Sequence, residues 1–124
     1  MARALMTDDG YVCVTRKTGR GVWCGYVAVP PTHPWHGLDY MQIESVKVHG
    51  GLTYAEHRPP EDALLELRLA SGDLVDTGWW LGFDCGHWGD FIPVLQKDGH
   101  VWTEDEVWLE VEKLLTAARH EAAG

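Results

Sequence analysis

The apolar residues of this chain fall into several short runs typical of β-strands, followed by one long run with helical spacing. Tyr11–Val14 and Val22–Val29 are rich in aromatic and β-branched residues, which favour strands. The segment Thr18–Gly21 between them has the composition of a turn. These two runs therefore predict a β-hairpin.

Two later stretches predict strands that end in glycine-containing loops. Ser45–His49 alternates until glycines at positions 50 and 51 interrupt it, and Leu52–Tyr54 follows as a second short strand. Gly78–Phe83 is strand-like and passes into Asp84–Asp90, where two glycines permit backbone conformations that other residues resist. His49 is thus expected at the end of a strand.

The clearest predicted element is a helix that begins at Thr103. Thr103 and Glu106 have the spacing of a capping box, and Trp102 and Val107 have that of a hydrophobic staple. Apolar residues then recur at helical spacing, which predicts one buried face, with Glu106 and Glu110 outside it. The residues of this face are Val107, Val111, Leu114, Leu115 and Ala118.

Together these elements predict a single α+β domain over residues 1–124, with a mainly antiparallel sheet, a C-terminal helix packed on one face and a flexible segment at residues 1–9. A chain of 124 residues has the size of one domain, and its seven Trp residues indicate a folded core. Nineteen acidic against ten basic side chains give a net charge of −9, which disfavours nucleic-acid binding.

The cysteine count and the hydropathy of the chain bear on its compartment. Cys13, Cys24 and Cys85 are an odd number and lack the C-x-x-C spacing, which fits a reducing compartment better than a disulfide scaffold. No run approaches the roughly 18 apolar residues that a membrane span needs. We expect a cytoplasmic protein without membrane contact.

Side chains able to do chemistry concentrate in His33–His36, His49–Gly51 and Asp84–Asp90. In the last two stretches, the predicted ligand-binding residues are His49, Gly50, Gly51, Asp84, Cys85, His87 and Trp88. Imidazoles and a carboxylate could hold zinc or another divalent metal, and the set we consider is His49, His87 and Asp90. Cys85 would be a nucleophile only with His49 or His87 within hydrogen-bond reach.

The same residues also allow a purely structural interpretation, without binding or catalysis. Asp84 and Asp90 could accept backbone amides in a tight loop, His49 or His87 could bond a carbonyl, and Cys85 could simply pack. For the first stretch, His33 and His36 could join a metal or contact an anion, but a solvated proline-rich lid is the preferred interpretation. Trp35 and Trp88 could wall an aromatic pocket or cap the core.

Three segments and the final helix carry a resemblance to a known family. The segments are CGYVAVP at Cys24–Pro30, VHGGLTYA at Val48–Ala55 and WWLGFDCGHWGD at Trp79–Asp90. Over roughly residues 20 to 118 the chain resembles an uncharacterised family of small proteins from bacteriophages and bacteria. The resemblance implies a phage-type origin and a shared site that includes His49, Cys85 and Asp90, and it names no activity. Residues 56–76 resemble a variable insertion or hairpin between the motifs.

Two hypotheses follow from these residues. The first is a small acidic phage-type accessory protein that binds a host protein or a small ligand such as a nucleotide, in the host cytoplasm if phage-encoded, and that serves in counter-defence. The alternative is a metal-dependent hydrolase in which His49, His87 and Asp90 hold the ion. Both require His49 and the loop Asp84–Asp90 to lie close together.

Overall fold

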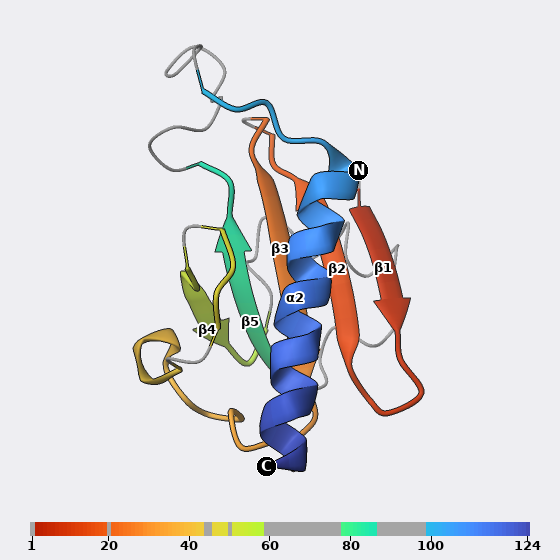
Figure 1. Ribbon diagram of the computed structural model, residues 1–124, viewed down its shortest axis with the longest axis vertical. Coiled ribbons are helices and arrows are strands. Elements are labelled where there is room, and N and C mark those ends of the chain that lie inside the picture. Colours follow the sequence, from red (N-terminus) through yellow and green to blue (C-terminus); the bar gives the residue numbers. More distant parts are fainter. Residues whose placement is uncertain (1, 20, 44–45, 50, 59–77, 87–98) are drawn as a thin grey trace.

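The computed structural model describes residues 2–19, 21–43, 46–49, 51–58, 78–86 and 99–124. Its centre is an antiparallel sheet with the strand order β1-β2-β3-β5-β4. Helix α2 (Glu104–Ala123) crosses one face of this sheet, over β2 and β3 (Figure 1). The strands are β1 (Ala2–Met6), β2 (Val12–Lys17), β3 (Trp23–Val29), β4 (Tyr54–Glu56) and β5 (Trp79–Asp84), and a 3-10 turn, η1, spans Tyr40–Gln42. This arrangement confirms the predicted α+β architecture.

The predicted hairpin is formed by β2 and β3. Val14 lies opposite Tyr26, and the connecting turn closes with a hydrogen bond from the Gly21 amide to the Thr18 carbonyl. The N-terminal residues, expected to be flexible, contribute β1, in which Leu5 lies opposite Cys13 of β2. This edge strand forms because the open edge of β2 offers the backbone of residues 2–6 hydrogen-bond partners that water would otherwise supply.

Both faces of the sheet are buried, which explains two large aromatic residues in succession. Trp79 packs in the cluster beneath α2, and Trp80 belongs to a second cluster on the opposite face, with exposed fractions of 8 % and 0 %. Side chains on a strand alternate between faces, so neighbours must enter different layers. Gly25 allows the helix to approach closely, because a Cβ there would lie 2.6 Å from both the Phe83 ring and Val111 Cγ2.

Helix α2 begins as the sequence predicts. Thr103 is the N-cap, its hydroxyl accepts the Glu106 amide at 3.2 Å, and the Glu106 carboxylate accepts the Thr103 amide at 3.0 Å. All five residues of the predicted apolar face are buried. The prediction is wrong for Glu110, which is only 9 % exposed, because its carboxylate turns inward to bind a backbone amide from another segment.

The predicted strand Ser45–His49 is not found in the described part, residues 46–49. Val48 packs in the core, while the His49 amide donates to Glu110 of the helix instead of to a neighbouring strand. His49 therefore does not end a strand, and the short strand after the glycines is β4, two residues later than expected. The predicted insertion at 56–76 falls almost wholly outside the described residues.

The C-terminal part of α2 is tied to the turn between β1 and β2 by an exposed ion pair. Arg119 Nε and Nη2 each donate to a carboxylate oxygen of Asp9 at 2.9 Å. These hydrogen bonds, together with one from Thr7, lower the pKa of Asp9 from its usual value of 3.8.

Along the ranges that the structure describes, no helix combines the length and apolar character that crossing a membrane requires.

We expect Asp9→Asn to lower the free energy of unfolding at pH 7 by about 0.5–1 kcal/mol, the usual worth of an exposed pair, since half of each side chain faces solvent. Because the folded pKa is the lower one, this stabilisation is present above pH 3.8 and is lost as the pH falls below it. The difference between the melting temperatures of wild type and variant should therefore shrink between pH 5 and about 2. Asp8→Asn is the control, and an equal shift for it would contradict the assignment.

Candidate functional site

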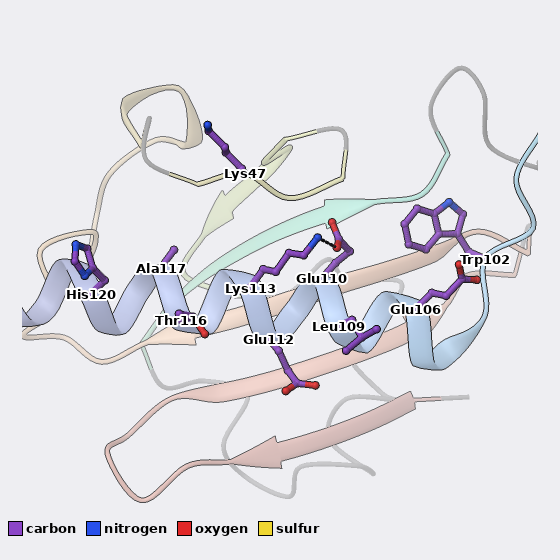
Figure 2. A pocket seen from close by; sticks show the side chains of 10 residues that line it. All are labelled: Lys47, Trp102, Glu106, Leu109, Glu110, Glu112, Lys113, Thr116, Ala117 and His120. Atoms are coloured by element: carbon purple, nitrogen blue, oxygen red, sulfur yellow. Dashed lines mark ion pairs between the residues drawn. The ribbon is translucent and has the colours of Figure 1, made fainter.

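An open groove runs along the outer side of α2 (Figure 2). It has a volume of about 820 Å³. The helix forms one wall, Lys47 reaches over it from the segment before β4, and Trp102 stands at the end nearest the start of the helix. Its lining comprises the carboxylates Glu106, Glu110 and Glu112, the basic side chains Lys47, Lys113 and His120, and Trp102, Leu109, Thr116 and Ala117.

Glu110 connects the two walls of this groove. Its Oε1 accepts the backbone amide of His49 at 2.8 Å, and its Oε2 pairs with Lys113 Nζ at 2.6 Å on the same helix. The carboxylate is mostly buried, while the ammonium group of Lys113 is exposed. The segment that carries Lys47 and His49 is thereby held against α2, and this contact fixes the width of the groove.

Trp102 lies between two imidazoles at the aromatic end of the groove. The ring centroid of His49 is 4.5 Å from that of Trp102, and that of His100 is 5.1 Å away in an edge-on arrangement. His100 Nε2 lies 2.8 Å from Glu106 Oε2. The hydrogen bond from His100, followed by that from the Thr103 amide, lowers the pKa of Glu106, so this carboxylate stays charged.

The wall formed by the helix mixes apolar side chains with charged and polar ones along its length. Leu109 is 59 % exposed, and Ala117 continues the apolar surface two turns further along α2. Lys47 and His120 stand toward the C-terminal end of the helix, opposite the end that holds Trp102 (Figure 2). The groove thus has an acidic and aromatic end and a basic end, and Leu109 and Ala117 provide apolar surface between them.

Of the predicted ligand-binding residues, the structure describes four: His49, Gly51, Asp84 and Cys85. The other residues of that set and of the metal set lie outside the described residues, namely Gly50, His87, Trp88 and Asp90. Antiparallel pairing places the start of β4 beside the end of β5, with Tyr54 opposite Gly82. The segment that contains His49 and the loop that begins at Asp84 therefore leave the same end of this strand pair.

The described contacts of Asp84 and Cys85 are those of the structural interpretation. Asp84 Oδ1 accepts the Gly86 amide at 2.9 Å, and its Oδ2 accepts the Thr53 hydroxyl at 3.4 Å. Cys85 is 2 % exposed, packs in the core beneath the helix, and its amide donates to the Trp23 carbonyl at 2.8 Å. In this arrangement Asp84 closes the turn after β5.

His33 is a buried structural residue and not part of a solvated lid. Its Nε2 donates to the Ala118 carbonyl of α2 at 2.7 Å, and its Nδ1 accepts the Trp35 amide at 2.9 Å. Because a carbonyl can only accept, these two bonds require the neutral imidazole protonated on Nε2. Trp35 is 4 % exposed and joins the core. The proline-rich loop is therefore attached to the helix by one of the two histidines that were expected in a solvated lid.

The remaining candidate groups within the described ranges include histidines and cysteines. Within the described ranges, no three His, Cys, Asp or Glu side chains come together to hold a metal ion. His57, for which the sequence offered no context, lies 6.1 Å from His36 between ring centroids, and both rings contact Trp79. All three cysteines are buried thiols, and burial raises the pKa of the Cys13 thiol to about 11.

Reasoning from the sequence missed the residues that line the groove. The predicted residue His49 lies beside this lining, in contact with Trp102. Glu106, Glu110 and Trp102 were assigned to helix capping and to the outer face of the helix. A faint signal was present, because Glu106, Leu109 and Lys113 follow a spacing of three or four residues on the side of the helix away from the core. The opposite wall could not be foreseen, since nothing local predicts that residues 46–49 run beside α2.

Comparisons with protein-family models, with curated proteins and with solved structures found no match for this chain.

Proposed function

We propose that this is a binding protein that holds a segment of a partner protein in the groove along α2. The observation that carries the proposal is the groove itself, whose walls are accessible along several turns of helix. Sites for small molecules enclose most of their ligand. An open groove with an exposed leucine in its middle instead suits an amphipathic segment that lays its apolar side against the helix.

The charge of the chain indicates which segments would bind. The net charge of the chain is −9, and the groove is lined by three carboxylates against two lysines. Electrostatic complementarity favours a partner segment with basic residues beside its apolar ones and speeds its association. The resemblance to phage-encoded proteins makes a host protein the proposed partner, with counter-defence as the biological role.

This proposal is tested by adding a charge inside and outside the groove. The probe is a 14-residue peptide of Leu, Ala, Gln and Arg with an amphipathic helical pattern, and its affinity is measured by calorimetry. Leu109→Asp should weaken binding about tenfold, because it removes an apolar contact of about 1.4 kcal/mol. Val101→Asp is the matched control, since Val101 is 61 % exposed against 59 % for Leu109 and lies outside the groove lining.

The two variants distinguish binding in the groove from a general electrostatic attraction between the peptide and the acidic protein. Each adds one carboxylate, so an association driven by net charge alone would tighten for both. A peptide of the same composition with scrambled order should bind wild type less tightly, because its apolar residues no longer share one face. Equal affinities of Leu109→Asp and wild type would reject the groove as the binding site.

A further inference from the structure

The acidic and aromatic end of the groove has a more specific chemistry than the rest. Trp102, Glu106 and Glu110 surround it, and Glu106 and Glu110 are one helical turn apart (Figure 2). We refer to these three residues as the acidic corner. Figure 2 shows the indole of Trp102 above the Glu106 carboxylate near the start of α2, with Glu110 further along the helix.

We propose that the acidic corner binds the guanidinium group of an arginine in the partner segment. This inference rests on the proposed function, because the arginine arrives on the segment that occupies the groove. The corner holds two carboxylates, and Lys113 is the cation that pairs with one of them. With neutral histidines this end of the groove carries a net negative charge that an incoming cation would neutralise.

The carboxylates of the corner retain room for a further donor. An ionised carboxylate can accept about four hydrogen bonds. Glu110 accepts one from the His49 amide and one from Lys113. Glu106 faces His100 through Oε2 and the Thr103 backbone through Oε1. These internal contacts hold both side chains in place, so an arriving guanidinium meets acceptors that are already oriented.

The same helix already shows this mode of recognition with a residue of its own chain. The guanidinium carbon of Arg3 lies 4.2 Å from the ring centroid of Trp108. Its Nη1 is 3.8 Å from Glu104 and 3.6 Å from Asp105. A tryptophan and two carboxylates on α2 thus hold an arginine on one side of the helix, and the acidic corner presents the same residue types on another side.

Arginine is favoured over lysine by the shape of the corner. A planar guanidinium can stack on the indole and direct its N–H groups at carboxylates beside the ring, whereas an ammonium group acts as a point charge. At the other end of the groove, the ammonium group of Lys47 would oppose a second arginine. The partner segment is therefore expected to carry its arginine at the end that lies beside Trp102.

The test compares two glutamates that differ in position but not in charge or exposure. The side chains of Glu104 and Glu106 are both 39 % exposed in the first turn of α2, and only Glu106 lines the groove. Glu106→Gln should weaken binding of the amphipathic arginine peptide about tenfold, the value of a charge-assisted hydrogen bond, while Glu104→Gln leaves it nearly unchanged. Glutamine also satisfies the capping box, so the helix should keep its cap.

A second peptide, with citrulline in place of each arginine, distinguishes this inference from the proposed function. Citrulline keeps the shape and removes the charge, so Glu106→Gln should not change its affinity. A lysine version should bind wild type more weakly than the arginine version. If Glu104→Gln and Glu106→Gln weaken binding of the arginine peptide equally, the acidic corner is not the arginine site. If Leu109→Asp still weakens binding in that case, the proposed function stands.

Discussion

Val111→Asp is expected to lower the free energy of unfolding by about 3–5 kcal/mol, the largest loss of the variants considered. Val111 is fully buried in the middle of α2, and its Cγ2 lies over Gly25 of the sheet. A carboxylate at this position would have neither water nor a basic partner from the apolar cluster around it. The cost of an uncompensated buried charge, about 3–5 kcal/mol, is a large part of the 5–15 kcal/mol by which a typical domain is stable.

Chemical denaturation followed by circular dichroism measures this loss. Leu109→Asp is the control, because it places the same side chain on the exposed side of the same helix and should shift the stability by no more than about 0.5 kcal/mol. An unchanged denaturation midpoint for Val111→Asp would mean that α2 does not pack on the sheet, and the fold itself would be wrong.

His33→Ala is expected to have the second-largest effect, about 3 kcal/mol of lost stability. The substitution leaves the Ala118 carbonyl and the Trp35 amide without their partners in a buried region and opens a cavity beside the Tyr11 ring. The thermal midpoint should fall clearly, and the peptide affinity of the protein that remains folded should stay close to that of wild type.

Two further variants isolate the role of the imidazole. His33→Gln keeps a side-chain amide that can donate to the Ala118 carbonyl, so it should recover part of the stability. His120→Ala removes an exposed histidine near the same end of α2 and should leave the melting temperature almost unchanged. If the His33→Ala protein is as stable as wild type, the result would contradict the buried role of His33 and favour the solvated-lid interpretation of the proline-rich loop.

The elements with strong local signals could be predicted from the sequence. The helix was recognisable because its cap, its first turn and its apolar stripe all point to the same boundaries, and the structure confirms Thr103 as the N-cap. The hairpin of β2 and β3 and the strand β5 were recognisable because their aromatic and β-branched residues favour strands wherever they pair. In each case the information lies within a few neighbouring residues.

The predictions that failed concern features that depend on contacts between residues distant in the sequence. Residues 46–49 alternate like a strand, yet Glu110 captures the His49 amide from 61 positions further along the chain. Glu110 looked solvent-exposed for the same reason, since no local pattern shows that a backbone amide will reach it. β1 forms because β2 has an open edge, which is a property of the sheet and not of residues 2–6.

The candidate site was likewise only partly predictable from the sequence. The motifs around His49 and Asp84 marked two segments that leave one end of the β4–β5 pair, as the antiparallel register requires. The groove, however, is built between α2 and a loop that precedes β4, so its lining could be assembled only from the fold. The motif around His49 therefore lies next to the segment that carries Lys47, and no local pattern showed that α2 faces this segment.

The many ties between α2 and earlier segments have a consequence for how the chain folds during synthesis. They join the helix to four separate parts of the preceding chain: Arg3 with Glu104, Asp9 with Arg119, His33 with Ala118, and His49 with Glu110. None of them can form before residues 104–123 have been made, so the growing chain holds a sheet whose apolar face is still uncovered. Closing such long loops is also slow. The nascent protein should thus depend on chaperones until its helix emerges, and ribosome stalling before residue 104 should leave it sensitive to protease.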